Sequence, residues 1–455
     1  MGALFERYHI EVRNTPAKIK LPPKYVVKRY NNCVNVQECI QACIFEVHRT
    51  RKDGQMADPI DELCRGCHLC ALACPKGAIS IGINPEFEKL GTSYFTSERI
   101  KTLYFEAETG RVPVSGTGYG GSFAGNGFDS IWFDFSEIVR PTRDGIHGRE
   151  YISTSVDLGR KLASLEFDKA GNLLSDIPRV FEIPIPMILD APLPSRSDRT
   201  LQLTIAKAAT RLNTFAVVNA KGYTDDLMPY QANLIPRMHP NEIEEFEDLI
   251  RISRIIELEL QGNELKDSLQ QIKETNRSVL VSFRVPYNEK SGECAEALTK
   301  MGADIIHLYN DDEVHEQTPE NITNTIHSIH SHLVAKHMRD EITFISSGGI
   351  AEAAHVPKSI ILGADAVSVG LAYQIALGCG VCYEDKHSDS CMLLIEPQDV
   401  EWAAQRIVNL IAAWRDQLLE VLGGMGLREV RRQRGELGRA MFYDDLEAKI
   451  FGGQG

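Results

Sequence analysis

The chain has 455 residues, of which 43% are hydrophobic and 25% are charged, an ordinary globular composition that is long enough for two or three domains. Its formal net charge of −14, with no basic block, argues against nucleic acid as a partner, and no apolar run approaches the ~20 residues of a membrane span. Eleven cysteines without a secretory leader predict cluster ligation in a reducing cytoplasm rather than disulfides.

A cysteine run dominates the N-terminal part of the chain. Residues 1–23 read as a polar extension, and residues 24–84 are predicted to form a ferredoxin-like iron–sulfur domain. The run Cys64-Arg-Gly-Cys67-His-Leu-Cys70-Ala-Leu-Ala-Cys74-Pro75 has the C-x2-C-x2-C-x3-C-P spacing of bacterial two-cluster ferredoxins. Zinc also binds C-x2-C pairs, but four cysteines at this spacing followed by proline are far from a zinc-ribbon pattern.

An incomplete second run lies upstream, with Val36 where a cysteine is expected. In two-cluster ferredoxins the fourth cysteine of each run ligates the other run's cluster. A complete ligand set for one 4Fe–4S cluster is therefore predicted at Cys43, Cys64, Cys67 and Cys70. The remaining set, Cys33, Cys39 and Cys74, leaves three alternatives open: a 3Fe–4S cluster, a 4Fe–4S cluster with a non-cysteine ligand, or an empty site.

Residues 85–182 are predicted to be a linker and a glycine-rich region that packs on the following domain. Residues 98–108 read as a helix, and a glycine-rich stretch follows over residues 114–127. Its glycines allow the backbone to approach a planar ligand or another domain closely.

Residues 183–397 alternate short β-type runs with helical runs, which predicts an α/β fold, a (β/α)8 TIM-type barrel beside the α+β dicluster ferredoxin-like domain. A doubly wound open sheet is the alternative, but the turn after the first strand, Asp190-Ala-Pro-Leu-Pro, lacks a G-x-G-x-x-G fingerprint. Pro236 makes the third strand the weakest. Strands are expected at 185–189, 215–219, 233–237, 255–260, 278–283, 304–308, 343–346 and 366–369, helices at 201–211, 242–251, 265–273, 295–301, 322–335 and 353–362, and C-terminal helices over 398–455.

The loops after the last two barrel strands predict a phosphate-binding site. Phosphate often binds there in such barrels, and glycines let backbone N–H groups turn toward it. The cofactor expected is FMN, because one-electron clusters need a partner that exchanges both one and two electrons. Arg284 and Gln261, at the ends of the fifth and fourth strands, are predicted to face the flavin and to act in catalysis. The residues expected to hold the phosphate are Ser347, Gly348, Gly349, Val369 and Gly370.

From residue 107 to residue 379 the chain resembles the FMN-binding barrel of the glutamate synthase family, in its stand-alone archaeal and bacterial form with a fused ferredoxin-like module. The stretches that carry the resemblance are Asp129-Ser-Ile-Trp, residues 137–159, Ser347-Gly-Gly-Ile, and Leu362-Gly-Ala-Asp-Ala-Val-Ser-Val-Gly370 with Ile375-Ala-Leu-Gly-Cys379. The resemblance implies FMN, an iron–sulfur cluster near it, and reductive amination of 2-oxoglutarate to glutamate with ammonia from glutamine. Cys379, Cys382 and Cys391 occupy the place of the family's 3Fe–4S ligands, at a different spacing.

The chain departs from the family at three places. Gln261-Gly262 is followed by Asn-Glu-Leu-Lys, the loop after the sixth strand is acidic at Asp311, Asp312 and Glu313, and Arg284 replaces a lysine. An acidic loop disfavours a dicarboxylate substrate unless it faces solvent.

Two functions follow from these patterns. The first is an iron–sulfur flavoprotein oxidoreductase of glutamate synthase type, with electrons passing from a ferredoxin or a redox subunit through the clusters to FMN. Because Met1-Gly2 offers no N-terminal nucleophile, a separate amidotransferase subunit is expected to supply ammonia. The alternative is an electron-transfer subunit of a larger redox complex with a degenerate substrate pocket.

Overall fold

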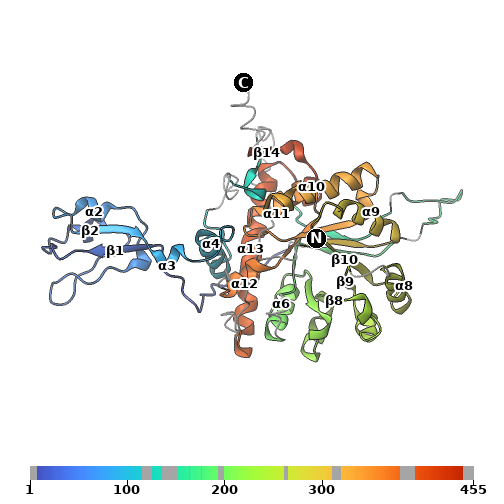
Figure 1. Cartoon of the computed structure of the whole chain (residues 1–455), viewed down its shortest axis with the longest axis horizontal. Helices are drawn as coiled ribbons and strands as arrows, with labels where there is room; N and C mark the ends of the chain where they lie inside the picture. The colour runs from blue at the N-terminus through green and yellow to red at the C-terminus, as the bar shows by residue number, and fades with distance from the viewer. Residues whose placement is uncertain are drawn as a thin grey trace, which may run out of the picture. The chain divides into compact units, whose positions relative to one another are not determined.

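The computed structural model describes residues 8–114, 125–135, 151–162, 164–175, 177–192, 199–260, 265–309, 319–379 and 395–443 (Figure 1). The described residues fall into two compact units. Residues 17–101 form the smaller unit, and the larger one contains the barrel and the long C-terminal helix.

The smaller unit is built on a two-stranded antiparallel sheet. Strand β1 (Tyr25–Arg29) pairs with β2 (Ile79–Ile83), so the two ends of the cysteine-rich segment lie side by side. Two five-residue helices, α1 (Glu38–Ala42) and α2 (Leu69–Ala73), pack against each other. Two cysteines share its small core, which consists of Val27, Cys39, Val47, Cys70 and Ile79. Helix α3 (Pro85–Glu88) and the start of α4 (Ser97–Thr109) complete the unit.

The larger unit is a closed parallel barrel in the strand order β6-β7-β8-β9-β10-β11-β12-β13, which confirms the predicted TIM-type fold. All eight predicted strands are present. They are β6 (Met187–Leu189), β7 (Ala216–Asn219), β8 (Leu234–Met238), β9 (Ile255–Glu259), β10 (Leu280–Pro286), β11 (Ile305–Tyr309), β12 (Thr343–Ser347) and β13 (Ala366–Val369).

Helices surround this barrel, as parallel strands require (Figure 1). The predicted helix over 242–251 is shorter than expected because Pro240 opens a 3-10 turn, where the Glu242 carboxylate accepts the backbone N–H of His239. The helices are α6 (Arg199–Arg211), α7 (Glu247–Ile252), α8 (Leu265–Thr275), α9 (Ser291–Met301), α10 (Pro319–Ala335), α11 (His355–Ile361) and α12 (Leu371–Leu377).

Strand β8 tolerates Pro236 at a cost in pairing. It pairs with β7 over four residues but with β9 only at Arg237 and Met238, after the proline. Proline has no N–H to donate, so one edge of the strand loses part of its ladder.

Helix α13 (Val400–Gly424) packs against α6, α11 and α12 and is buried along most of its length. Arg406 on this helix donates to the backbone carbonyls of Thr15, Tyr104 and Ala376. A single buried side chain thus joins the N-terminal segment, α4 and α12 to the C-terminal helix.

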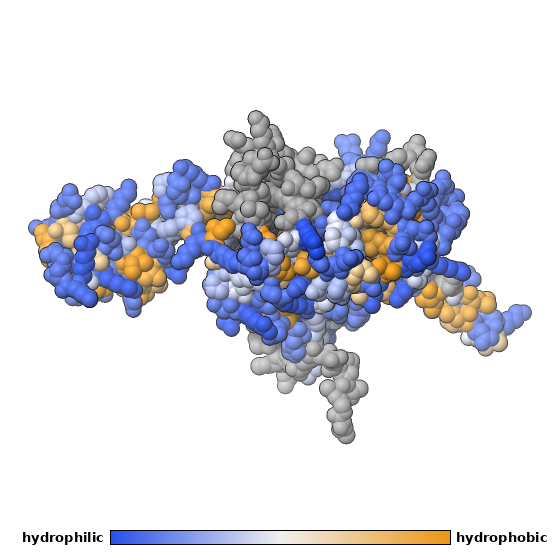
Figure 2. Space-filling view, turned by 90° about the horizontal axis from the view of Figure 1, so that it is seen from below, coloured by the Kyte–Doolittle hydropathy of each residue, from blue (hydrophilic) through white to orange (hydrophobic). Residues whose placement is uncertain are grey.

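Short strands outside the barrel form two further ribbons. Strand β3 (Ile131–Phe133) pairs with β14 (Ala440–Phe442), and β4 (Val156–Gly159) pairs with β5 (Val180–Ile183). The arm between β4 and β5 exposes hydrophobic side chains, which stand out in Figure 2. They include Leu165, Phe167, Leu173 and Leu174. None of the helices in the described ranges has the length and hydropathy that a membrane crossing requires.

Candidate flavin and iron–sulfur sites

The interior of the barrel near its carboxyl-terminal mouth holds a buried ion network, which we call the inner tier: Asp190, Arg237, Glu257 and His307. Arg237 donates from Nη2 to Asp190 (2.5 Å) and from Nε to Glu257 (2.7 Å). His307 Nδ1 lies 2.6 Å from the other Glu257 oxygen. All four residues are at most 7% exposed. The interior layers of such barrels are usually filled by branched apolar side chains, so this network is a departure that calls for a function.

The charge states of the inner tier follow from its pairing. Burial alone would raise the pKa of Glu257, but His307 and Arg237 outweigh it and hold that pKa below its ordinary value. Asp190 shows the same balance, with Arg237 and His307 lowering its pKa against burial. Since Glu257 is ionised and has no proton to give, His307 Nδ1 carries the hydrogen between them. Nε2 of His307 then faces Oδ2 of Asp190 at 3.9 Å, and neither atom has a hydrogen-bond partner among the described residues.

A second group, the outer tier, stands nearer to solvent: His239, Glu259, Arg284 and Tyr309. Each outer-tier residue lies two positions after an inner-tier residue, except Arg284, which lies two positions after Ser282. Because side chains alternate along a strand, the two residues of each pair point to the same side, into the barrel. Arg284, predicted to face the mouth, does so. Its guanidinium lies 3.8 Å from the centre of the Tyr309 ring and 3.5 Å from a Glu259 oxygen. Glu259 is also 3.2 Å from His239.

The two loops predicted to hold phosphate lie side by side, because β12 and β13 are neighbours and Ser347 pairs with Ser368. Gly348 and Gly349 have φ of 86° and 68°, a conformation that points backbone N–H groups in directions side-chain-bearing residues rarely allow. Ser347 itself is buried and donates to the Leu308 carbonyl. Two neighbouring side chains, Ser368 and Gln374, are buried with polar atoms that have no hydrogen-bond partner in the part of the chain that the structure describes. Such orphaned groups suit a polar ligand, so these residues fit the phosphate end of FMN.

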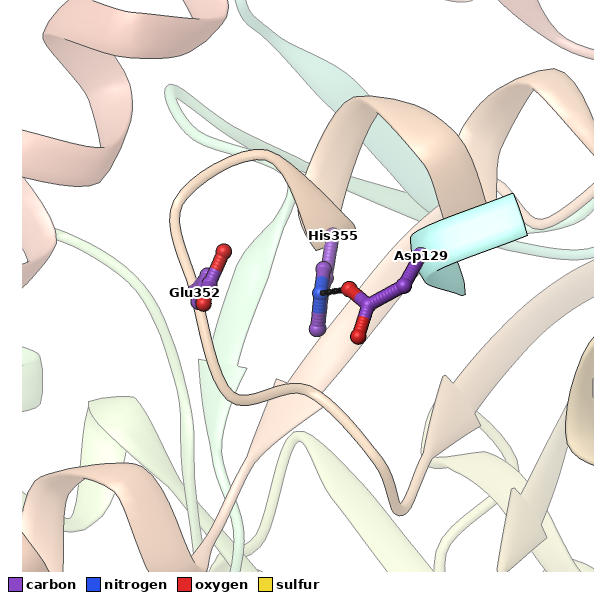
Figure 3. A group of neighbouring side chains, drawn as sticks. All are labelled: Asp129, Glu352 and His355. Carbon is purple, nitrogen blue, oxygen red and sulfur yellow. Dashed lines mark hydrogen bonds and ion pairs between the residues drawn. The ribbon is translucent and has the colours of Figure 1, made fainter. Parts of the chain in front are cut away.

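A histidine anchors the loop that follows β12 (Figure 3). His355 Nδ1 lies 3.1 Å from the backbone nitrogen of Ala351 and 3.0 Å from the Gly349 carbonyl oxygen, and its Nε2 lies 3.4 Å from an Asp129 oxygen. Glu352 lies beside them, and ligand atoms of the three side chains are within 4.8 Å of one another. His355 is also stacked on Phe128, with ring centroids 5.0 Å apart. The arrangement ties the glycine loop to the segment around Asp129.

The smaller unit gathers its cysteines into two groups. Burial, followed by the nearby thiols of Cys43 and Cys64, raises the pKa of Cys70 to about 11. Cys64 is in turn next to Cys43 and Cys67, so the predicted four-cysteine set is brought together. Burial likewise raises the pKa of Cys39, whose thiol neighbours are Cys33 and Cys74, the predicted three-cysteine set. Thiol ligands must lose their protons to bind metal, and a bound cluster would reverse these shifts.

Several predicted residues are outside the described ranges. Gln261, Cys382, Cys391 and the acidic loop at residues 311–313 belong to this group. Cys379 is described: it is buried at the end of α12, where its N–H donates to the Gln374 carbonyl. Val369 and Gly370 are buried at the end of β13, and the Val369 carbonyl accepts the Asp190 N–H.

Reasoning from the sequence missed the inner tier. A signal was present in the strands, where polar residues alternate with apolar ones as Arg-Met-His, Glu-Leu-Glu, Ser-Phe-Arg and His-Leu-Tyr. Strands of a parallel barrel are normally apolar on both faces. Alternation in four consecutive strands therefore indicates a polar interior.

Known proteins are similar to both the cysteine-rich part and the barrel part of the chain. The conserved region of glutamate synthase matches residues 243–428, from just before α7 to just beyond α13, and a 4Fe–4S binding domain matches residues 58–80. An archaeal-type glutamate synthase (NADPH) of Dehalococcoides mccartyi is 25% identical over 92% of this chain and 95% of its own length. The archaeal glutamate synthases (NADPH) of Archaeoglobus fulgidus and Methanocaldococcus jannaschii are also 25% identical, over 96% and 95% of this chain and 97% and 98% of theirs.

Similarity to solved structures is weaker. A mutant flavocytochrome b2 with pyruvate bound gives a TM-score of 0.46 at 11% identity, over 75% of this chain and 82% of that one. An IMP dehydrogenase/GMP reductase-like protein from Corynebacterium glutamicum gives 0.43 at 13% identity, over 70% and 94%. Scores this low add nothing about function. The sequence matches, by contrast, confirm the predicted resemblance: the chain joins a 4Fe–4S binding domain to the conserved region of the glutamate synthases.

Proposed function

We propose that the protein is an iron–sulfur flavoprotein oxidoreductase of glutamate synthase type, which reductively aminates 2-oxoglutarate to glutamate. The observation that carries this proposal is similarity to archaeal-type glutamate synthases over more than nine-tenths of both chains. The gathered cysteines and the paired loops after β12 and β13 supply matching sites for clusters and for a flavin phosphate.

FMN, when bound, supplies chemistry that links one-electron and two-electron transfer. We assign its phosphate to the loops at Ser347, Gly348 and Gly349 and at Val369 and Gly370. We expect their backbone N–H groups to donate hydrogen bonds to the phosphate, together with the Ser368 hydroxyl, which has no partner among the described residues. Arg284 would orient an anionic group at the mouth, and Gln261 is assigned to the flavin ring from its place after β9.

The inner tier would serve this reaction by holding a proton. An imine is a better hydride acceptor when its nitrogen is protonated, so the barrel needs a proton source close to the mouth. His307 is oriented by Glu257 through Nδ1, and its Nε2 is available to give or take a proton beside Asp190. This is the arrangement expected of an oriented acid–base histidine.

Electrons would enter at the ferredoxin-like unit from a soluble ferredoxin or a redox subunit, and Cys379 with Cys382 and Cys391 would hold a further cluster near the flavin. The ammonia would come from a separate amidotransferase subunit. We also propose a reducing compartment such as the cytoplasm, because the cysteine spacing suits cluster ligation rather than disulfides.

One observation favours a second function, that of an electron-transfer subunit whose substrate pocket is degenerate. Arg284 is already engaged by Glu259, and the inner tier places two more carboxylates behind it. A dicarboxylate substrate would have to compete with these acids for the same cations.

Anaerobic half-reactions separate the two functions. Protein purified without oxygen is analysed for iron, sulfide and FMN, reduced with light, and mixed with 2-oxoglutarate, with ammonia, or with both. Flavin reoxidation only when both are present supports amination. If neither reagent changes the rate of flavin reoxidation, while an artificial electron acceptor still reoxidises the flavin, the result rejects amination. It then supports the electron-transfer subunit.

A further inference from the structure

The two cysteine runs fold alike, residue for residue, at an offset of 31 positions. Left-handed backbone conformations occur at Asn35 and Gln37 in the first run (φ 60° and 63°) and at Gly66 and His68 in the second (69° and 61°). A third pair follows at Glu46 and Gly77, both with φ 56°. The hydrogen bonds match as well: Cys33 N–H donates to Tyr30 as Cys64 N–H does to Asp61.

This symmetry places Val36 where the second run has Cys67, on a backbone of the same conformation. The first run maintains that conformation with asparagine, glutamine and glutamate, whereas two of the three equivalent positions in the second run are glycine. A left-handed conformation is strained for a residue other than glycine, and least strained for asparagine. Strain of this kind persists where the surroundings or a ligand require the shape.

The three thiols of the first set line a small cavity. Its walls include Cys33, Cys39 and Cys74, together with Val36, Met56 and Ile79. The backbone N–H of Ala78 donates to Cys74 Sγ at 3.3 Å. The chemistry of this donor set therefore fits an iron–sulfur cluster, with a hydrocarbon side chain at the position of the fourth ligand.

We propose that Cys33, Cys39 and Cys74 hold a 3Fe–4S cluster, beside the 4Fe–4S cluster of Cys43, Cys64, Cys67 and Cys70. Each iron of a cubane needs its own thiolate, and Val36 offers none, so the corner of the cubane that faces it stays without iron. Bound there, such a cluster would supply one-electron transfer, with the electron coming from a reduced ferredoxin or redox subunit. The inference needs only metal occupancy and is independent of the amination proposed above.

Replacing Val36 by cysteine tests this directly. In oxidised protein a 3Fe–4S cluster has three ferric ions and half-integer spin, and gives an EPR signal, whereas an oxidised 4Fe–4S cluster is silent. Val36→Cys should lose one such signal and gain one iron per chain after anaerobic reconstitution. Ile83→Cys is the matched control: it adds an exposed thiol to the same unit, at a residue that does not line this cavity, and should change neither readout.

A second variant identifies the ligand set without relying on the first. Cys33→Ala should lose the same oxidised EPR signal and about three irons, while the signal of the reduced 4Fe–4S cluster remains. An unchanged iron content would show an empty site. Loss of four irons with no oxidised signal to lose would show a 4Fe–4S cluster with a non-cysteine ligand. Either result, or an unaltered Val36→Cys spectrum, overturns the proposal.

Discussion

At Arg284 the positive charge is shared between a carboxylate and an aromatic ring. Glu259 approaches to 3.5 Å and is 27% exposed, so solvent weakens the pair. Exposed ion pairs are worth about 0.2–1 kcal/mol. Glu259→Gln should therefore tighten binding of 2-oxoglutarate by roughly 1.4- to 5-fold, the equivalent of that energy. Titration of the flavin absorbance with 2-oxoglutarate measures this.

The control for that variant is Glu247→Gln, which removes the same charge from a surface pair on α7. It should leave the affinity unchanged. Equal tightening in both variants would mean that overall charge, rather than release of Arg284, governs binding. Weaker binding in Glu259→Gln would show that the carboxylate itself contacts the substrate.

Arg237 carries more of the stability than any surface cation we consider, because it neutralises two carboxylates inside the barrel. Removing one member of a buried ion cluster typically costs about 3–5 kcal/mol, since the charges left behind are unpaired. Arg237→Met should lower the free energy of unfolding by about that amount in chemical denaturation. Arg251→Met, on an exposed pair of α7, should change it by less than about 0.5 kcal/mol.

A companion variant separates charge from packing. With Asp190→Asn and Glu257→Gln added, Arg237→Met leaves no uncompensated charge, and part of the stability should return. If the triple variant is no more stable than Arg237→Met alone, lost packing rather than unpaired charge explains the effect.

Single residues were predictable where chemistry fixes the spacing. Cluster ligation requires a fixed cysteine spacing, and the pleat decides which side chains point into a barrel, so seven ferredoxin-type cysteines and Arg284 could be selected from sequence. The cysteines form two groups and Arg284 belongs to the outer tier, while their roles stay predictions. The inner tier was not predictable in this way. A charge inside a barrel is stable only with partners from other strands, and a strand's own sequence does not show which residues of other strands lie beside it. Asp190, Arg237 and His307 come from three different strand ends, separated by up to 117 residues (307 − 190).

At the scale of elements, a buried carboxyl group on α4 is hydrogen-bonded to α13. Glu106 on α4 accepts a hydrogen bond from the Trp414 indole on α13 at 2.9 Å. Burial raises the pKa of Glu106 to about 8, with a smaller contribution from Glu352. The folded protein thus holds a proton that the unfolded chain releases above its ordinary pKa of 4.5. Stability from this group is complete below about pH 4.5 and is lost as pH rises toward 8, by up to about 1.4 kcal/mol per pH unit.

Glu106→Gln keeps the shape and the hydrogen bond without the titration. The variant should gain stability over the wild type progressively between pH 5 and pH 8, as measured by thermal melting at each pH, with a slope of at most about 1.4 kcal/mol per pH unit. Glu274→Gln, on the exposed face of α8, should follow the wild type throughout. A constant offset at every pH would show that Glu106 does not titrate in this range.

Elements were predicted well because barrel strands are short apolar runs between turn residues, and all eight were found. Their ends were less certain, since tertiary contacts decide them. Strand β10 extends to Pro286, three residues beyond the prediction, because β11 continues beside it and Pro286 pairs with Tyr309. Residues 242–246 are not in the α-helix predicted for 242–251, because a proline-initiated turn at 240–242 precedes α7.

At the scale of the whole molecule, the seven ferredoxin-type cysteines and the residues assigned to the flavin belong to different compact units. Each unit has its own core: Val27, Val47 and Ile79 with two cysteines in one, and the barrel interior in the other. Loss of a cluster ligand should then leave the barrel folded. This separation was predictable from the cysteine spacing and the later β/α alternation, whereas the composition of each core needed the structure.

Cys67→Ala tests that independence in the full chain. Cys67 is the most exposed of the four-cysteine set, so its replacement removes one ligand with little loss of packing. The EPR signal of the reduced 4Fe–4S cluster should disappear and the iron content should fall, while the ratio of FMN to protein and reduction of the flavin by light stay at wild-type values. Electron transfer from an external ferredoxin to the flavin should slow at least tenfold, because the entry cluster is gone. Cys294→Ser, on α9 of the barrel, is the matched thiol control and should keep every signal. Loss of FMN along with the cluster in Cys67→Ala would instead mean that the two units depend on each other for folding, and that electron entry and flavin binding cannot be assigned separately.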